Sequence, residues 1–126
     1  MIKKEKILFS YIANIIEDEK PRNIFIQTKL DISKLLKRIE KLDIETLSIG
    51  PDTKNISTEN FDLFIILDDV EFSEADIGTV KNLISQKIVI FTDFINDKII
   101  DETMLKLGLQ TELRDKTNKL KCYSYN

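Results

Sequence analysis

Histidine and tryptophan are absent from the 126-residue sequence, and cysteine occurs once, at Cys122. Without histidine the chain can offer no Ser-His or Cys-His nucleophile, no imidazole metal ligand and no histidine acid or base. A single cysteine excludes an internal disulfide and a thiolate metal cluster, and it suits a reducing compartment. The chemistry that remains is that of carboxylates and lysines, or binding without covalent catalysis.

Long apolar runs and an excess of positive charge are also lacking. No run reaches the roughly 18 residues that a membrane span needs, and polar residues interrupt the first apolar stretch, unlike a signal peptide. We therefore expect a cytoplasmic protein that does not enter a membrane. The net charge is −3, whereas nucleic-acid binders usually carry a basic face. This charge argues against nucleic acid as the partner.

The composition is that of an ordinary globular domain, with 42% hydrophobic and 33% charged residues. A chain of this length can bury about two thirds of the surface that its unfolded state exposes, which is enough to fold alone. Internal repeats, low-complexity tracts and linkers are not found in the sequence. We expect one domain over residues 1–126, with an N-terminal helix at 1–20 and a C-terminal hairpin at 109–126.

The spacing of apolar residues predicts alternating helices and strands. Recurrence every three to four positions predicts helices, at about 2–19, 31–42, 73–84 and 96–107. Continuous apolar runs predict strands buried on both faces, at 23–27, 45–49, 61–67 and 87–92. Alternating residues at 110–115 and 119–125 predict a hairpin. Together these elements predict an α/β, Rossmann-like three-layer sandwich, with a mostly parallel sheet of about six strands and a C-terminal antiparallel hairpin.

Several helix ends carry signals of their own. Pro21 stops the first helix, Asp31 can cap the second, and Gly108 ends the last. Ser73 and the acid three positions later resemble the start of the third helix. The predicted buried face of the last helix consists of Ile99, Ile100, Met104 and Leu105.

Three stretches resemble a shortened class I S-adenosylmethionine-dependent methyltransferase. Residues 61–72, where an apolar strand runs into Asp68 and Asp69, look like the fourth-strand motif of that family. Residues 87–92 look like its fifth strand, and 107–125 look like its ending, a Leu-Gly helix terminus followed by a hairpin. The chain is most similar to short bacterial proteins with degenerate methyltransferase-like cores. The resemblance implies S-adenosylmethionine as the cofactor of an intact site.

The cofactor site departs from the family pattern. The family holds the cofactor with a glycine-rich turn after the first strand, because only glycine lets the backbone approach the ligand closely. The corresponding turn at 27–31, Gln-Thr-Lys-Leu-Asp, contains no glycine. The third strand of the family does not fit between 49 and 61, and Gly50-Pro51 displaces the acid, Asp52, that would bind ribose. We expect no cofactor; S-adenosylmethionine binding is the alternative.

Polar side chains follow the ends of the predicted strands, at the edge where parallel sheets bind ligands. Asp68 and Asp69 follow one strand and Asp93 follows its neighbour, so the three carboxylates can form an acidic cluster. Thr28 and Lys29 follow the first strand at the same edge, and the lysine can meet a phosphate or a carboxylate. The same pattern is typical of a solvated sheet edge. We expect no catalytic residue and no metal; the candidate ligand-binding residues are Thr28, Lys29, Asp52, Asp68, Asp69 and Asp93.

Three functions remain open. The lost glycine turn and the missing strand favour a non-catalytic methyltransferase-like module that acts in protein interaction or as a structural part. A reduced S-adenosylmethionine-binding methyltransferase, or another small-ligand binder, is the second function, because methyl transfer needs no histidine. The third is a degenerate receiver-like signalling domain with Asp68 as phosphoacceptor, although receivers hold magnesium after the first strand and end in a parallel strand and helix.

The expected partner is an unknown protein or a second copy of the chain in a weak homodimer. Without a third strand, the strand at 45–49 lies at an edge of the sheet, where unpaired backbone groups can bind another chain. The tail hairpin forms the other margin, and apolar surface there is a second place for a contact.

Overall fold

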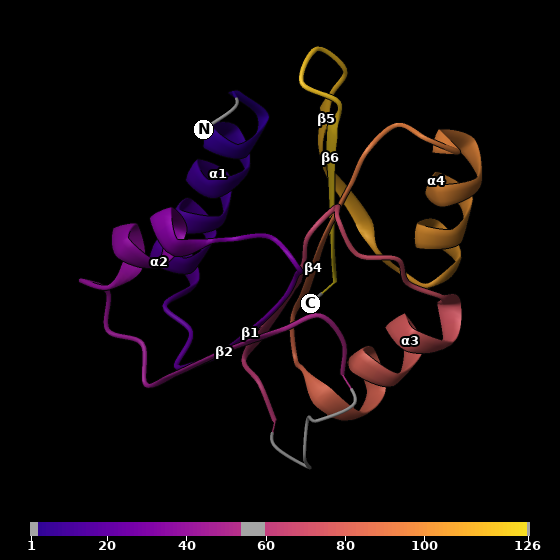
Figure 1. Ribbon diagram of the computed structural model, residues 1–126. Helices are drawn as coiled ribbons and strands as arrows, with labels where there is room; N and C mark the ends of the chain where they lie inside the picture. The colour runs from indigo at the N-terminus through magenta and orange to yellow at the C-terminus, as the bar shows by residue number, and fades with distance from the viewer. Residues whose placement is uncertain (1–2, 54–59, 126) are drawn as a thin grey trace.

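The computed structural model describes residues 3–53 and 60–125, which form one sheet of six strands covered by helices. The strands are β1 (Asn23–Gln27), β2 (Thr46–Gly50), β3 (Leu63–Ile66), β4 (Ile88–Thr92), β5 (Gln110–Asp115) and β6 (Leu120–Tyr125). Their order across the sheet is β2-β1-β3-β4-β6-β5, and Figure 1 shows the sheet between helices on its two sides. The first four strands run parallel, and β6 is antiparallel to β4 and β5. The predicted fold class is confirmed.

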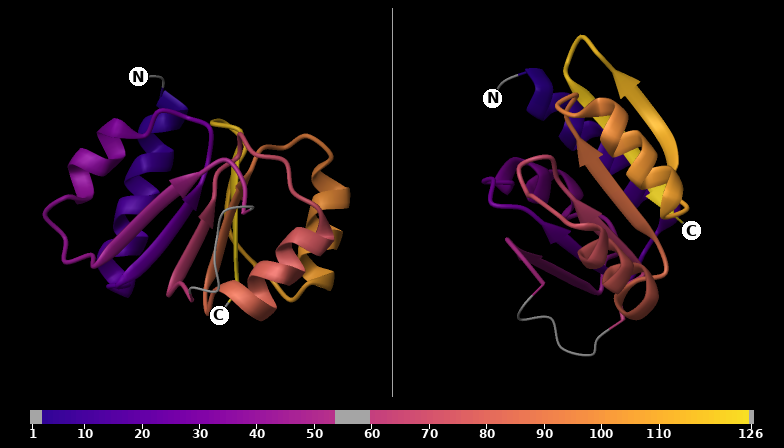
Figure 2. Two further views of the ribbon diagram at one scale, coloured as in Figure 1. Left: turned by 60° about the horizontal axis from the view of Figure 1, so that its bottom comes forward. Right: turned by 90° about the vertical axis from the view of Figure 1, so that its right-hand side faces the viewer.

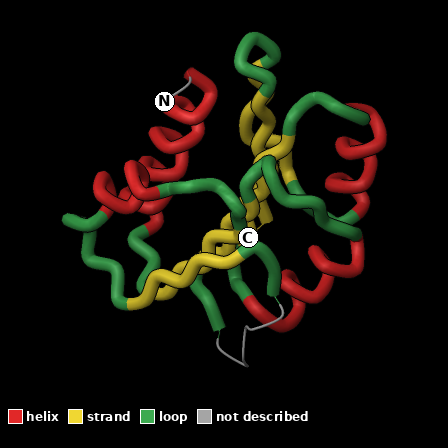
Figure 3. Tube along the Cα trace, in the orientation of Figure 1, coloured by secondary structure: helices red, strands yellow, loops and turns green. Residues whose placement is uncertain are grey.

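Helices cover both faces of this sheet (Figures 2 and 3). α1 (Lys3–Glu19) and α2 (Ser33–Ile39) lie on one side; α3 (Glu74–Thr79), the π-helical turn η1 (Val80–Ile84) and α4 (Asp97–Lys106) lie on the other. Alternate residues of each central strand therefore enter different cores. Ile65 and Val89 pack with α1 and α2, whereas Phe64 and Ile90 pack with α3, η1 and α4. In the described part of the chain, no helix has both the length and the apolar character needed to cross a membrane.

The central strand, β3, is shorter than the strand predicted at 61–67. All four residues of β3 are buried, as predicted, and the strand lies between β1 and β4. The side chain of Asp62 accepts hydrogen bonds from the backbone N–H groups of Arg22 (2.8 Å) and Asn23 (3.0 Å). Phe61 makes an isolated bridge to Ser85. The predicted strand of 61–67 thus begins at Leu63, because the residues before it join the preceding loops instead.

The second helix differs in detail from its prediction. It begins at Ser33 and ends at Ile39, short of the predicted 42. Its N-cap is Ile32 rather than Asp31. Asp31 Oδ1 accepts the Ser33 N–H at 3.0 Å, so the carboxylate closes a local turn before the helix. The third helix begins as predicted, because Ser73 and Asp76 form a reciprocal capping box.

The predicted buried face of the last helix is wrong at two positions. Ile100 and Met104 pack into the core, but Ile99 is 63% and Leu105 77% exposed. At 3.6 residues per turn, the four predicted positions cover well over half of the helix circumference. One contact with the sheet cannot bury so wide an arc, so only the central pair is covered.

The β2 edge of the sheet and the direction of β6 bear on two other predictions. β2 forms one margin because no further strand pairs with it in the described chain, as the missing third strand predicts. β6 pairs antiparallel with β4, where a receiver has a parallel final strand. The receiver hypothesis is therefore wrong about the topology.

Two glycines in helical surroundings should respond oppositely to alanine. Gly108 follows α4 with a φ of 84°, and a left-handed conformation costs an alanine about 1 kcal/mol. Gly78 lies inside α3, where an added Cβ meets no atom within 4 Å, so alanine there should stabilise by about 0.5–1 kcal/mol. Urea denaturation should show a lower midpoint for Gly108→Ala and a higher one for Gly78→Ala. Shifts of the same sign would contradict this account.

Candidate functional site

The turn after β1 lies where the sheet's connections reverse direction, between β1 and β3, the usual ligand site of open α/β sheets. Such sites bind ligands through backbone N–H groups of the turn. Here three successive N–H groups have acceptors within the chain. Thr28 donates to the carbonyl of Gly50 (2.9 Å), Lys29 to Asp69 Oδ2 (2.6 Å) and Leu30 to Thr28 Oγ1 (3.0 Å). The backbone N–H groups of this turn are therefore already hydrogen-bonded within the chain.

Asp69 ties this turn to the end of β3. Its Oδ2 accepts the Lys29 N–H, and its Oδ1 accepts the hydroxyl of Thr28 at 2.7 Å. Beside it, the Leu67 N–H donates to the carbonyl of Gln27 at 3.1 Å. Thr28 is buried, so its bond to Asp69 is partly shielded from water, whereas the bond from Lys29 is exposed. The crevice between β1 and β3 is closed by a carboxylate of the chain itself.

The neighbouring carboxylate, Asp68, binds the first helix. Its Oδ2 lies 2.5 Å from the ammonium of Lys4, near the start of α1, and only 12% of its side chain is exposed. Lys4 was not among the predicted site residues. The short basic start of the chain was the signal available, but nothing in the sequence places the beginning of α1 over the end of β3.

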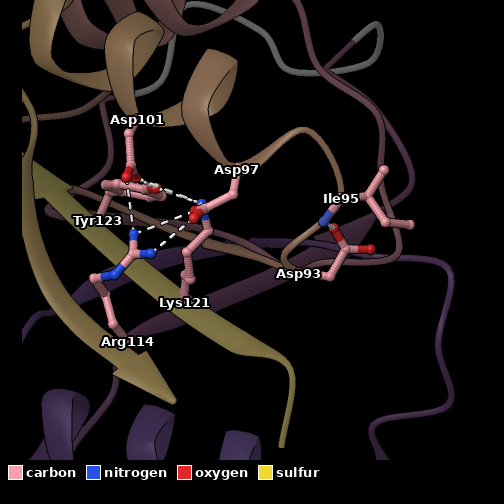
Figure 4. A network of polar contacts seen from close by, with 7 residues as sticks. All are labelled: Asp93, Ile95, Asp97, Asp101, Arg114, Lys121 and Tyr123. Carbon is pink, nitrogen blue, oxygen red and sulfur yellow. Dashed lines mark hydrogen bonds and ion pairs between the residues drawn. The ribbon is translucent and has the colours of Figure 1, made fainter. Parts of the chain in front are cut away.

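A cleft of about 490 Å³ opens beside these two residues. The loop after β3 forms one wall with Asp68, Asp69 and Glu71, and the loop after β4 contributes Asp93. Asp93 Oδ1 accepts the N–H of Ile95 at 2.9 Å (Figure 4). No lysine or arginine is found among the described residues that line the cleft. The structure thus brings the three predicted aspartates to one place.

The remaining candidates divide between two strand ends. Thr28 and Lys29 contact Asp69 from β1. Asp52 follows β2, on the other side of β1 from the cleft. Within residues 3–53 and 60–125, no three acidic or cysteine side chains are grouped so that they could hold a metal ion. The carboxylates are instead directed to a hydroxyl, an ammonium and backbone N–H groups.

Thr92 is the polar residue of the cleft that stands out by its lack of a partner. It is the last residue of β4, lines the cleft and is 8% exposed. Its Oγ1 is buried and makes no hydrogen bond to any described residue. Most buried side-chain hydroxyls are paired, so Thr92 is an exception to the usual pattern. In sequence it is simply the β-branched end of an apolar strand.

A second polar cluster lies between β6 and α4 (Figure 4). Lys121 is fully buried, and its ammonium lies 2.5 Å from Asp97 Oδ1 and donates to the Tyr123 hydroxyl at 2.7 Å. The Tyr123 hydroxyl donates to Asp101. Arg114 on β5 lies 2.7 Å from Asp97 and 2.8 Å from Asp101. Each polar group has partners, so this cluster fastens the hairpin to α4.

The sequence contained an overlooked signal for this cluster. Lys121 shares one face of β6 with Tyr123 and Tyr125, and the sheet was predicted to be covered on both faces. A lysine on a covered face needs an acidic partner, and α4 offers Asp97 and Asp101. Tyr123 packs in the core.

The charges of this cluster should appear in acid titration. The hydrogen bond from Arg114, followed by that from Lys121, lowers the pKa of Asp97 to about 2. A lowered pKa in the folded state stabilises the fold above the unfolded pKa of about 4, and this contribution is lost as the pH falls towards 2. Between these values, the free energy of unfolding should fall less steeply for Asp97→Asn than for the parent. Equal slopes by urea denaturation would contradict this assignment.

Comparison with known proteins gives matches in structure only. No family model matches the chain, and no curated protein matches it in sequence. The rRNA methylase of Escherichia coli is similar with a TM-score of 0.59 and 11% identity, over 93% of this chain and 62% of that one.

Two further structures give the same result. The ribosomal protein L11 methylase of Lactobacillus delbrueckii subsp. bulgaricus has a TM-score of 0.57 and 10% identity, over 98% of this chain and 79% of that one. The methyltransferase domain of bacterial CtHen1-CN has a TM-score of 0.57 and 6% identity, over 98% of this chain and 100% of that one. At these identities the likeness concerns the fold. The chain has an α/β fold similar to that of these methyltransferases.

Proposed function

We propose that this chain is a cytoplasmic methyltransferase-fold module that binds no S-adenosylmethionine and acts by binding another protein or a second copy of itself. The observation that carries the proposal is the bridge from Asp69 to Thr28 and Lys29. A cofactor at this crevice would have to break both hydrogen bonds and leave Asp69 without partners.

The β1 turn supports the same proposal. A pyrophosphate, sugar or amino-acid group is held there by free backbone N–H groups and by glycines that allow close approach. The N–H groups of residues 28–30 are all engaged, and the turn has no glycine. The methyltransferase fold is thus retained without the turn that would hold its cofactor.

The proposed contact surface is the β2 edge. β2 pairs with β1 on one side, and no described strand pairs with its other side. Ile49 on this strand is 43% exposed. An edge strand with an exposed apolar side chain favours strand addition by another chain.

Calorimetric titration with S-adenosylmethionine and S-adenosylhomocysteine tests the absence of a cofactor. We expect no heat of binding to the parent protein, and no shift of its melting temperature, at millimolar ligand. Asp69→Ala serves as the matched variant, because it removes the bridge and leaves the turn sequence intact. Micromolar binding by the parent would overturn the proposal in favour of a reduced methyltransferase.

Light scattering over a concentration series tests the β2 edge. If the partner is a second copy, the apparent mass should rise with concentration for the parent but not for Ile49→Lys, because an edge lysine opposes strand pairing. The control is Ile99→Lys, which removes an exposed isoleucine from α4 instead. A monomeric mass at high micromolar concentration would exclude self-association and leave a different protein as the proposed partner.

A further inference from the structure

We propose that the cleft between the loops after β3 and β4 binds an alkylammonium ion, that is, a primary amine carried on an aliphatic chain. This site adjoins the β1 turn, with which it shares Asp69, and none of its described lining residues belongs to β2. Amine binding at this site goes beyond the proposed function and does not depend on it.

The first argument is the hydroxyl of Thr92. Its Oγ1 is shielded from solvent and has no acceptor or donor among the described residues. An unpaired buried hydroxyl is costly, and Thr92 lines the cleft. A hydroxyl oxygen can accept a hydrogen bond from an N–H group. A rotation of the Thr92 side chain would turn its hydroxyl towards the cleft, where a donor would supply the missing partner.

The second argument is charge. Asp68, Asp69, Glu71 and Asp93 line the cleft without a basic residue among its described lining. The Lys4 ammonium neutralises Asp68, but Asp69, Glu71 and Asp93 form no ion pair with any lysine or arginine that the structure describes. An anion would be repelled by this lining and a cation attracted. An ammonium group carries three donors, enough to bind Thr92 Oγ1 together with carboxylate oxygens.

The third argument is the apolar part of the lining. Phe72, Phe91, Ile95 and Ile100 contribute to the same cleft as the acids. Ile95 is 70% exposed. A bare metal ion would gain nothing from these side chains, and the described acids are not grouped to hold one. The methylene groups of an alkylamine would pack against them while its charged end binds the acids.

Titration of the full chain with pentan-1-amine, followed by amide NMR, tests this site. We expect saturable shifts at the amides of Thr92, Asp93 and Ile95, with a dissociation constant of about 1 mM. The neutral isostere pentan-1-ol should bind at least about tenfold more weakly, because it lacks the charge. Nα-acetyl-lysine methyl ester forms a second arm. Binding of both amines would indicate a lysine side chain of a protein as the natural ligand, and binding of the free amine alone a small molecule.

Two variants locate the site. Thr92→Val and Asp93→Asn should each weaken amine binding by about tenfold or more. Thr111→Val and Asp18→Asn, which lie outside the cleft, should leave it unchanged. Circular dichroism confirms that each variant is folded. The proposal would be overturned if the cleft amides did not shift, or if pentan-1-ol bound as tightly as pentan-1-amine. It would also be overturned if both cleft variants bound the amine as tightly as the parent protein does. Each of these results is independent of cofactor binding and of self-association.

Discussion

Replacing Lys121 by alanine is expected to lower the free energy of unfolding by about 3 kcal/mol. The side chain of Lys121 is fully buried, and its ammonium contacts Asp97 and the Tyr123 hydroxyl. Its loss removes the packed methylene stem and one partner of a buried ion pair, which costs about 3–5 kcal/mol when the remaining charge is left alone. Asp97 and Asp101 are about a third exposed and keep Arg114, which places the expected loss at the lower end.

Lys121→Met separates the two contributions. Methionine restores most of the apolar volume without the charge, so we expect a loss of about 1 kcal/mol, because a well-packed apolar residue often replaces a buried ion at small cost. Urea denaturation at neutral pH measures both variants. Equal losses for alanine and methionine would show that packing contributes little beside the charge. A stability unchanged in both would contradict the role of the cluster in fastening the hairpin to α4.

The two central strands β3 and β4 were predictable because nearly all of their side chains are apolar. β3 and β4 are covered on both faces, so their continuous apolar runs identify them directly. The position of β2 at an edge followed from the lack of room for a further strand before Phe61. α4 was less predictable, because its apolar residues Ile99 and Leu105 face solvent and carry the same signal as buried ones.

The candidate site was predictable in its location and not in its partners. Parallel strands bring their carboxyl ends to one edge, so Asp68, Asp69 and Asp93 could be grouped from sequence. Which group each carboxylate binds depends on contacts distant in sequence. Thr28 and Asp69 are 41 residues apart, and Lys4 and Asp68 meet only because α1 begins at that edge. A buried hydroxyl without a partner, as in Thr92, leaves no trace in a sequence at all.

The second large effect is expected at two buried threonines that differ in one respect. Thr92 Oγ1 has no partner in the described chain, whereas Thr28 Oγ1 donates to Asp69 and accepts the Leu30 N–H. Valine has nearly the same shape as threonine without the hydroxyl. Thr92→Val removes an unpaired buried polar group and should raise the free energy of unfolding by about 1–2 kcal/mol. Thr28→Val leaves Asp69 and the Leu30 N–H without their hydrogen-bond partner, and should lower the free energy of unfolding by about 1–3 kcal/mol.

Urea denaturation of the two variants without any ligand measures these opposite shifts. Because Thr92→Val is also expected to weaken binding of pentan-1-amine, stability and binding should change in opposite directions at this one position. A residue that served only the fold would not behave in this way, since its loss would reduce stability. If Thr92→Val is instead destabilised as much as Thr28→Val, the hydroxyl of Thr92 already has a partner in the free protein. In that case the cleft has no unsatisfied group to offer an ammonium ion.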